Sequence, residues 1–583
     1  MVAFDLQKFF RFALCLGLGQ HQDGCARNDT SLKLSKTFSS DNFAEGFENA
    51  WIAGSPENGN GNGKAHGRQF SAVLEGYEAP FRVSINTENV LHRVDRRFLS
   101  TGVGTGRLTC DVKNIFPFNS TSVRTLARGL SPAVFRVGGK HADETVFSPE
   151  QTCSNISVGA SDIFNSKVLT ATAWKDLHTF ATSTGLDVSY ALNLCLRNGS
   201  VWNSTNARQL LQHNSKLGYE VIWQLGNEPL LFRKNYNISL TARQISQDFL
   251  TLRGLLSQRQ YRDAGLLVGP DLEKLHLHSR LSDDVAAQAS KNVTAYYERF
   301  LRRAGSAINA TTVHFYNIHH DNTTSVSDFL DPDILDRTRI ELSKYRDAVH
   351  EAMPEAPLDR WLGETSSVTS GGLRNASSRF VAGFLLLNNL GLAAKMNIGI
   401  FTYWNIFGNF YSLITMDERP AALYWVCLLH KRLVGQKVLS LALDTDADVK
   451  GASDRQRYVR VFAHCTSDAS SYEAGSLTII AMNMMNDTTA VLRLMGDLAR
   501  KNVDEYVLTP QGGDLTAQYV QLNGETLEMI DNRTLPKTLP RPLPAGSNIT
   551  LQPLTYGFYV IRDASAAACN GKAAGLGPSY EVI

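Results

Sequence analysis

Short apolar segments alternate with longer amphipathic segments through the middle of the chain. The predicted strands are Phe98–Gly104, Ala133–Gly138, Asp187–Asn193, Glu220–Leu225, Gly265–Gly269, Thr311–Tyr316, Arg360–Gly363 and Ile398–Tyr403. The segments with helical periodicity are Trp174–Thr182, Thr205–Lys216, Ala242–Ser257, Asn292–Ala304, Asp333–His350 and Arg379–Ala394. Strand–helix order repeated in this way predicts an α/β fold, namely a (β/α)8 TIM barrel.

After about residue 430 the spacing of apolar residues changes to every second position, which is typical of half-buried strands. The alternating runs are Arg457–His464, Ser476–Asn483, Ala490–Met495, Val503–Thr509 and Ile549–Arg562. They predict a C-terminal β-sandwich appended to the barrel. We therefore expect a poorly structured signal or spacer segment over 1–78, a catalytic barrel over 79–430 and a sandwich over 431–583. Residues 80–86 are predicted to form a further strand, which is a candidate member of the sandwich.

The composition excludes several classes of protein. The chain has 583 residues, of which 43% are hydrophobic and 20% charged, and this is ordinary globular composition rather than that of a disordered or coiled-coil protein. The formal net charge is only +2, so no global positive field exists to attract nucleic acid or an anionic membrane. The sequence contains no run of about 18 apolar residues, which is the length needed to cross a membrane, and so it predicts no membrane-spanning segment.

Glycosylation signals are the strongest indication of compartment. The N-x-S/T sequence occurs 13 times, against about four expected by chance at average composition. The signals lie at Asn28, Asn119, Asn155, Asn198, Asn203, Asn237, Asn292, Asn309, Asn322, Asn375, Asn486, Asn532 and Asn548. The apolar residues 12–19 add a weak leader-like feature. We expect a glycoprotein that is secreted into the extracellular matrix or delivered to lysosomes.

Two glutamates follow predicted barrel strands. Glu228 lies in WQLGNEP (Trp223–Pro229) and Glu364 lies in WLGETSS (Trp361–Ser367), at the ends of the fourth and seventh strands. Catalytic groups of such barrels lie at the carboxyl ends of the strands, so both side chains are expected at one cleft. A pair of carboxyl groups about 5–5.5 Å apart is the requirement for glycoside hydrolysis with retention. An acidic pH optimum is expected, because one group must be protonated and the other ionised.

These motifs resemble those of the heparanases. The similar segments include WQLGNEP, HFY (His314–Tyr316) and WLGETSS, and they extend to TLARGLSPAVFRVGG (Thr125–Gly139), DFLDPDILD (Asp328–Asp336), YWVCLLHKRLVGQKVL (Tyr424–Leu439) and TYGFYVIR (Thr555–Arg562). The resemblance covers about Pro80 to Cys569. It implies a retaining endo-β-glucuronidase that combines a clan A barrel with a β-sandwich.

The resemblance also implies roles for single residues. Glu228 would be the acid/base, Glu364 the nucleophile and Asn227 the partner of the sugar 2-hydroxyl. Tyr316 would orient Glu364, while His314 and Arg136 would line the same cavity, although a purely structural role for these three side chains remains an alternative. Uronate recognition is assigned to Tyr411 and to the backbone N–H of Gly371.

Several positions depart from the family pattern. Ser370 replaces a glycine, Gly104 and Gly106 replace acidic and amide side chains, and Lys140 replaces a threonine. The basic clusters that bind heparin in the family are sparse over 164–177 and 271–291. The remaining candidates for sulfate contacts are Arg233 with Lys234, and Arg302 with Arg303.

The eight cysteines include no CxxC pair. The resemblance implies a disulfide between Cys465 and Cys569. Cys110 and Cys153 are a further possible pair, and Cys195 and Cys427 are expected to be buried thiols. We expect no cofactor and no metal, since the spacing of His314, His319 and His320 fits no standard site.

The interval 151–173 corresponds to the segment excised from animal heparanase proenzymes, and its 23 residues predict an enzyme that works without excision.

The leading hypothesis is a glycosidase that hydrolyses glucuronic acid linkages within heparan sulfate. One alternative keeps the chemistry but changes the substrate, to removal of terminal glucuronic acid or cleavage of less sulfated glycosaminoglycans. A second alternative is a non-catalytic matrix protein that binds heparan sulfate. Heparan sulfate or a related glycosaminoglycan is the expected partner, with no nucleic acid and no integral membrane segment.

Overall fold

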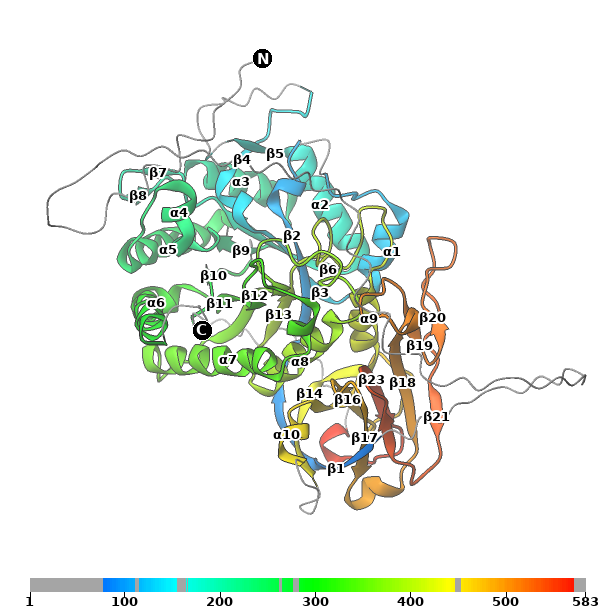
Figure 1. Cartoon of the computed structure of the whole chain (residues 1–583). Coiled ribbons are helices and arrows are strands. Elements are labelled where there is room, and N and C mark those ends of the chain that lie inside the picture. The colour runs from blue at the N-terminus through cyan, green and yellow to red at the C-terminus, as the bar shows by residue number, and fades with distance from the viewer. Residues whose placement is uncertain are drawn as a thin grey trace, which may run out of the picture. The chain divides into compact units, whose positions relative to one another are not determined.

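A computed structural model describes residues 77–110, 115–154, 164, 166–261, 265–275, 283–445 and 452–570. Apart from its last two residues, the segment 1–78 lies outside the described residues, and so do the glycosylation signals at Asn28 and Asn155. Within the interval 151–173 that bears on proenzyme excision, residues 155–163 and 165 also lie outside them. The described chain belongs to a single compact unit, in which a barrel is joined to a second sheet (Figure 1).

The barrel prediction is confirmed. Eight parallel strands are hydrogen-bonded in the order β10-β11-β12-β13-β2-β3-β6-β9. Their bounds are β2 (Leu99–Gly104), β3 (Ala133–Gly138), β6 (Leu186–Leu192), β9 (Ile222–Leu225), β10 (Val268–Leu272), β11 (Ala310–Ile318), β12 (Asp359–Val368) and β13 (Ile400–Tyr403). The ring closes between β9 and β10, where Trp223 N donates to Leu266 O at 2.7 Å.

Helices cover the outside of this barrel, as the amphipathic segments predict (Figure 1). They are α1 (Thr121–Gly129), α2 (Ala171–Thr184), α3 (Thr205–Leu217), α4 (Phe232–Tyr236), α5 (Ala242–Leu256), α6 (Asp283–Ala304), α7 (Pro332–Ala352), α8 (Ala382–Lys395) and α9 (Ala422–Leu433). Local signals set their starts. At α5, Thr241 and Gln244 form a capping box, and at α7 the side chain of Asp331 accepts from Asp333 N.

The loops at the carboxyl ends of the strands carry small additional elements. A short parallel pair is formed by β4 (Thr145–Ser148) and β5 (Lys167–Thr170), and an antiparallel pair by β7 (Arg197–Asn198) and β8 (Val201–Trp202). The 3-10 helix η1 (Thr105–Arg107) follows β2, and η2 (Lys140–Glu144) follows β3.

The second sheet has 11 strands and is mostly antiparallel. Its strands are β1 (Tyr77–Arg93), β14 (Val434–Thr445), β15 (Val459–Thr466), β16 (Leu477–Asn483), β17 (Thr488–Leu494), β18 (Val503–Pro510), β19 (Val520–Leu522), β20 (Glu525–Thr526), β21 (Arg541–Leu543), β22 (Ile549–Leu551) and β23 (Thr555–Ile561). The short helix α10 (Ala452–Gln456) lies between β14 and β15. The strand predicted over 80–86 lies within β1, which pairs with β14 and β17.

Alternation along β23 shows how this sheet is buried on both faces. Tyr559 and Ile561 join a core shared with β1, β17 and β22, so the sheet folds over on itself as a sandwich does. Phe558 and Val560 point the other way, into the core that also contains the barrel helices. The ring of Tyr556 stacks on Phe380 with centroids 4.4 Å apart, and its hydroxyl donates to Phe380 O at 2.9 Å. One continuous apolar core therefore joins the barrel to the second sheet.

The helix α8 lies at this junction, which explains why it is apolar on every side. It contacts α7 and β12 on the barrel side and β15 and β16 on the other. Its two interior amides are paired. Asn388 Nδ2 donates to Leu335 O at 3.0 Å, and Asn389 Oδ1 accepts from Thr338 Oγ1 at 2.6 Å. Among the described residues, no helix is both long and apolar enough to cross a membrane.

Both expected cysteine pairs are disulfides, Cys110–Cys153 and Cys465–Cys569. Cys195 and Cys427 are buried free thiols, as predicted, and burial raises the pKa of the Cys427 thiol to about 12. Disulfides are characteristic of oxidising compartments, which supports passage through the secretory pathway.

Candidate active site

The two glutamates singled out in the sequence meet at the carboxyl end of the barrel. Glu228 follows β9 in a left-handed backbone conformation with φ 53°, and its N–H donates to Asp271 O at 2.9 Å. Glu364 lies in β12, where it is in register with His314 of β11. One carboxylate oxygen of Glu228 lies within 4.8 Å of one of Glu364. That closest approach is slightly shorter than the roughly 5–5.5 Å of retaining enzymes and well short of the roughly 6.5–9.5 Å that leaves room for a water in inverting enzymes.

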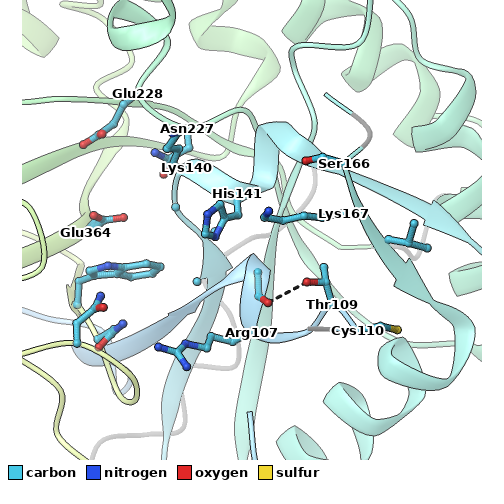
Figure 2. Close-up of a pocket in the computed structure, with 18 of the residues that line it drawn as sticks. Arg107, Thr109, Cys110, Lys140, His141, Ser166, Lys167, Asn227, Glu228 and Glu364 are labelled. Carbon is cyan, nitrogen blue, oxygen red and sulfur yellow. Dashed lines mark hydrogen bonds between the residues drawn. The ribbon is translucent and has the colours of Figure 1, made fainter. Parts of the chain in front are cut away.

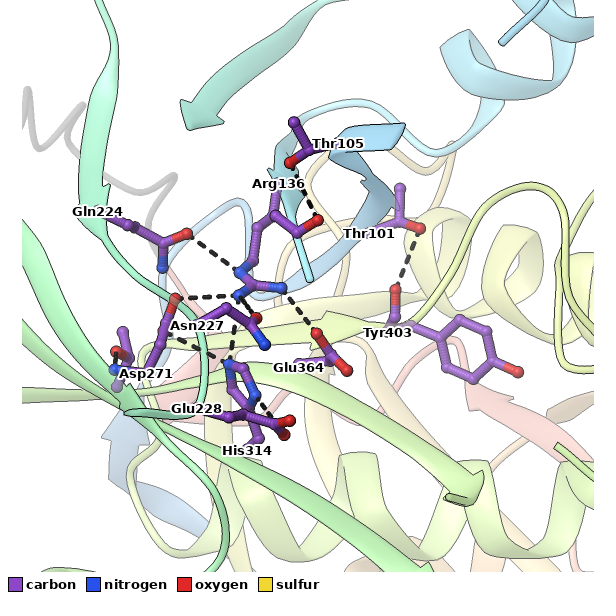
Figure 3. A network of polar contacts seen from close by, with 12 residues as sticks. Thr101, Thr105, Arg136, Gln224, Asn227, Glu228, Asp271, His314, Glu364 and Tyr403 are labelled. Carbon is purple, nitrogen blue, oxygen red and sulfur yellow. Dashed lines mark hydrogen bonds and ion pairs between the residues drawn. The ribbon is translucent and has the colours of Figure 1, made fainter. Parts of the chain in front are cut away.

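Arg136 connects the residues around this pair (Figure 3). Its side chain, on β3, is only 1% exposed, and it donates to Glu364 Oε2 at 2.9 Å, to Asn227 Oδ1 at 2.9 Å and to Asp271 Oδ2 at 3.0 Å. Its Nε donates to Gln224 Oε1 at 3.0 Å. Burial alone lowers the pKa of the guanidinium, but Asp271 and Glu364 outweigh burial and raise that pKa above its usual value. Arg136 is therefore a fixed positive charge against Glu364.

His314 contacts the other carboxylate. Its Nδ1 lies 3.0 Å from Glu228 Oε1, and its Nε2 lies 3.3 Å from Arg136 Nη2 and 3.6 Å from Asp271 Oδ1. Burial lowers the pKa of the imidazole, whereas Glu364 together with hydrogen bonds to Asp271 and Glu228 raises it to about 10. For Asp271, burial raises the carboxyl pKa, but Arg136 and His314 reverse this and hold it well below its usual range. The result is a buried, alternating arrangement of positive and negative groups.

Tyr316, from the same strand as His314, contacts the second glutamate. Its hydroxyl donates to Glu364 Oε1 at 2.5 Å, so that Tyr316 and Arg136 engage the two different oxygens of one carboxylate. Burial and the neighbouring Glu364 raise the pKa of this phenol well above its usual value. The hydroxyl donates this hydrogen bond and thereby fixes the orientation of Glu364.

Asp143 is a neighbour of the site that the sequence analysis missed. It lies in η2 with no exposed surface, and its two oxygens accept from Leu194 N and Asn227 N, each at 2.9 Å. Burial raises the pKa of its carboxyl to about 8, against the opposing effect of these two N–H donors. Asp143 thus holds the backbone just before Glu228 against the end of β6.

An open cleft of about 900 Å³ lies above the two glutamates (Figure 2). Its lining includes Asn227, Glu228, Glu364, Trp404 and Asn409 near the carboxylate pair. The opposite side of the lining carries four basic side chains, Arg107, Lys140, His141 and Lys167. The Trp404 ring also stacks against Arg136, whose guanidinium carbon lies 5.2 Å from the ring centroid.

The other residues predicted to bind substrate lie in different surroundings. Tyr411 is buried beside Tyr316, with ring centroids 6.3 Å apart. Gly371 has φ 95°, in the region that favours glycine, and its carbonyl accepts from Phe410 N at 3.0 Å. Arg233 and Lys234 are exposed side chains of α4 and do not line the cleft. Arg302 pairs with Glu298 and Glu351 on the surface of α6. The roles of these residues stay predictions.

Ligand atoms of Glu228, His314 and Glu364 all lie within 4.8 Å of one another, a spacing that a metal ion could bridge. Two observations speak against a metal ligand set. Both ring nitrogens of His314 already face carboxylates, Nδ1 that of Glu228 at 3.0 Å and Nε2 that of Asp271 at 3.6 Å. Arg136 also places a positive charge 2.9 Å from Glu364. The donor set is therefore an ion-pair cluster in which protein cations provide the charge that a metal would bring.

Comparison with known proteins identifies the family. The model of the glycosyl hydrolase family 79 N-terminal domain matches residues 111–391. Heparanase of Bos taurus is 35% identical over 83% of this chain and 91% of its own length. The chain belongs to glycosyl hydrolase family 79. It is thus related to the heparanases, as the sequence motifs indicate.

Members with other names are similar as well. The hyaluronoglucuronidase of Hirudo nipponia is 30% identical over 84% of this chain and 99% of its own length. Inactive heparanase-2 of Homo sapiens is 29% identical over 84% of this chain and 89% of its own length. Among solved structures, the family 51 arabinofuranosidase of Xanthomonas axonopodis pv. citri superposes with a TM-score of 0.57 over 83% of this chain and all of its own chain. At 14% identity, that likeness concerns the fold alone.

Proposed function

We propose that the protein is a retaining endo-β-D-glucuronidase that hydrolyses glucuronic acid linkages in heparan sulfate. The observation that carries the proposal is the pair Glu228 and Glu364, whose oxygens approach within 4.8 Å beneath an open cleft. The two carboxylates also differ in surroundings. Glu364 is 7% exposed and held by Arg136 and Tyr316, whereas the Glu228 side chain is 22% exposed and contacts His314. This difference supports different roles for the two groups.

In the first step, an oxygen of Glu364 attacks the anomeric carbon of the bound glucuronic acid. The bond from that carbon to the glycosidic oxygen breaks, and Glu228 transfers its proton to the departing oxygen. Arg136 and Tyr316 hold Glu364 in one orientation, which limits the reorganisation needed at the moment of attack. Asn227, held by Asp143 and Arg136, is placed to contact the 2-hydroxyl of the sugar.

In the second step, water attacks the anomeric carbon of the covalent intermediate. Glu228 now removes a proton from that water, and the bond between the sugar and Glu364 breaks. Two inversions give net retention at the anomeric carbon. His314 stabilises Glu228 when it carries a negative charge, since the imidazole lies 3.0 Å from its carboxylate.

Three features support a glycosaminoglycan substrate. The chain is similar to heparanases along most of its length. The cleft volume of about 900 Å³ is near the upper end of the roughly 300–1,000 Å³ of pockets that enclose drug-sized ligands, so it has room for more than one sugar. Four basic side chains line it, which suits an anionic polymer.

The disulfides favour an extracellular or lysosomal location.

The proposal is tested by digesting heparan sulfate with the purified full-length protein and sizing the products over time. Internal cleavage lowers the mean polymer length early, whereas removal of terminal glucuronic acid releases monosaccharide while the polymer stays long. The anomeric configuration of the first product, read by NMR, tests retention. Products with inverted configuration, or no products at all from the wild type, would sink the proposal.

The relative named inactive heparanase-2 makes a binding protein the second candidate. Under that alternative the protein binds heparan sulfate without turnover. Wild type and Glu364→Gln are compared for both binding and turnover, because both variants are expected to bind. Equal background turnover with undiminished binding would favour the binding protein, whereas turnover by the wild type alone supports the hydrolase.

A further inference from the structure

The hairpin formed by β7 and β8 presents an apolar side chain to solvent. Val201 is 61% exposed, and among the described residues only Leu539 is a more exposed large apolar side chain. The hairpin belongs to the loop that follows β6 and lies at the outer margin of the barrel (Figure 1). Single exposed apolar residues are common on protein surfaces, so the meaning of Val201 depends on what lies beside it.

The two positions of each strand in this hairpin face opposite ways. Arg197 is in register with Trp202, and Asn198 is in register with Val201. The first pair faces the protein, because Trp202 is only 4% exposed and Arg197 Nη1 donates to the buried Asp248 at 2.8 Å. Since side chains alternate along a strand, Asn198 and Val201 share the outer face of the hairpin.

Asn198 and Val201 are also close neighbours. Residues directly opposite each other in an antiparallel pair have Cβ atoms about 4.5–5.5 Å apart. The turn between them consists of Gly199, whose φ of 61° favours glycine, and Ser200, whose carbonyl accepts from Arg197 Nη2 at 2.6 Å. The turn is therefore fixed, and it keeps the two side chains next to each other.

The same turn contains a glycosylation signal. Asn198, Gly199 and Ser200 form the N-x-S sequence, and all three residues are exposed. When such a signal is used, the amide Nδ2 bonds to the anomeric carbon of an oligosaccharide carried on a lipid pyrophosphate. The amide loses one proton, and the lipid pyrophosphate leaves. The two disulfides support passage through the secretory pathway, where this donor is available.

We propose that Asn198 carries an N-linked glycan whose first N-acetylglucosamine packs on the side chain of Val201. One face of the sugar ring consists largely of C–H groups, and this face and the valine both gain free energy when they leave water together. The sugar is attached to the cross-strand partner of Val201, so little further freedom is lost when it settles there. Neither residue lines the catalytic cleft, and the inference is independent of the proposed hydrolysis.

A second turn repeats this arrangement. Asn532 begins an N-x-T signal, is exposed and has a φ of 55° at the tip of the turn. Ile530 is 56% exposed and bridges to Thr534 of the same signal, where Ile530 N donates to Thr534 O at 2.8 Å. The adjacent Met529 is turned inward, and its Sδ accepts from Ser122 Oγ at 3.6 Å. The glycan on Asn532 is therefore expected to cover Ile530 in the same way.

The test measures how fast each glycan is released from the folded protein. Glycopeptide mapping of full-length protein secreted by animal cells first establishes which signals are occupied. The protein is then treated without denaturant with a peptide N-glycosidase in heavy-oxygen water, and mass spectrometry reads each freed site as a labelled aspartate. A sugar packed on Val201 is accessible only while it is detached. Val201→Ser is therefore expected to speed release at Asn198 about 5-fold, and Val201→Phe to slow it.

The signal at Asn322 is the matched control. Asn322 is exposed, and its neighbours on both sides in the sequence are polar. Release at Asn322 is expected to be equal in the wild type and in both Val201 variants. Ile530→Ser is expected to speed release at Asn532 alone. Thermal unfolding of each variant is expected to match that of the wild type, because the altered side chains lie at the surface.

Three results would overturn the proposal. Wild-type protein without a glycan on Asn198 would leave Val201 uncovered. Equal release rates at Asn198 in the wild type and in both Val201 variants would show that the sugar does not touch the side chain. A dimer of the wild type that Val201→Ser converts to a monomer in light scattering would show that Val201 contacts a second copy of the chain. None of these measurements involves glycosaminoglycan turnover, so they are decided separately from the proposed function.

Discussion

Arg136 Nη1 of β3 donates to Glu364 Oε2 of β12 at 2.9 Å inside the barrel, and the same guanidinium also contacts Asp271 and Asn227. Three groups, from β10, from β12 and from the end of β9, are thereby held by one planar cation. A guanidinium can do this because its donors point in fixed directions, which an ammonium group cannot reproduce.

Replacing Arg136 tests this arrangement. Arg136→Lys keeps the charge but loses most of the donors, so we expect kcat to fall about 100-fold or more. Arg136→Met leaves Asp271 buried without its cation, which is expected to lower the free energy of unfolding by about 3–5 kcal/mol. Steady-state kinetics and urea unfolding measure the two effects. A Lys variant with wild-type kcat would show that positive charge alone is sufficient.

The acid role proposed for Glu228 predicts a dependence on the leaving group. Glu228→Gln is expected to lower kcat/KM on natural linkages by about 10²–10⁴, the usual contribution of general acid–base catalysis. With an aryl glucuronide whose leaving group needs no proton, the first step is expected to recover and the second to become limiting. A burst of released phenol measured by rapid mixing checks this. A similar loss on both substrates would contradict the assignment.

His314 predicts a change of stability at alkaline pH. Its folded-state pKa of about 10 is above the unfolded value of 6.5, because Glu364, Asp271 and Glu228 surround it. The stability it contributes is therefore complete below about pH 6.5 and is lost as pH rises through about 10. We expect the free energy of unfolding of the wild type to fall between pH 6.5 and 10, and the fall to be smaller in His314→Asn. His350→Asn, at an exposed position, is the control for this comparison.

The Cys465–Cys569 disulfide closes 104 residues of the second sheet. Cross-links of that length are expected to stabilise by about 4–5 kcal/mol in the loop-entropy description, and native disulfides typically contribute about 2–5 kcal/mol. Cys465→Ser/Cys569→Ser should therefore unfold at a lower urea concentration. If the midpoint is unchanged, the two buried half-cystines contribute through packing alone.

The environment of Asn309 predicts an unused glycosylation signal. Its Oδ1 accepts from Arg253 Nη2 at 2.7 Å and from Leu267 N at 2.9 Å, beside the barrel closure, and the residue is half-buried. Asn237, Asn322 and Asn548 are exposed by contrast. Peptide mapping of secreted protein is expected to find Asn309 unmodified and glycan at the exposed signals. A glycan found on Asn309 would contradict this prediction.

Much of the fold could be predicted because the barrel strands are short buried runs, and six of the eight are followed by a segment of clear helical periodicity. The strand predicted at Gly265–Gly269 is displaced to Val268–Leu272. The sequence there contains Pro270 and Asp271, a pair typical of turns, so the prediction ended the strand too early. In the structure Asp271 is instead a buried partner of Arg136, a tertiary contact that overrides the local signal.

The carboxylate pair could be predicted from the sequence, whereas much of its surroundings could not. Glu228 follows β9 and Glu364 lies in the carboxyl-terminal half of β12, and the carboxyl ends of the strands converge in a barrel whatever the details of packing. Asp143 and the basic side chains that line the cleft come from η1 and η2, which are short 3-10 turns after β2 and β3, and from β5, a four-residue strand far along the chain from β3. Only the folded chain shows that Lys140 and Lys167 approach the same Glu144.

The place of β1 has a consequence for synthesis on the ribosome. This strand is made before any part of the barrel, yet it pairs with β14 and β17, which are translated more than 300 residues later. Until then its exposed backbone edge is available to other strands, and such edges promote misassociation. Chaperones that shield extended segments are therefore expected to occupy this part of the nascent chain until β14 and β17 have been made.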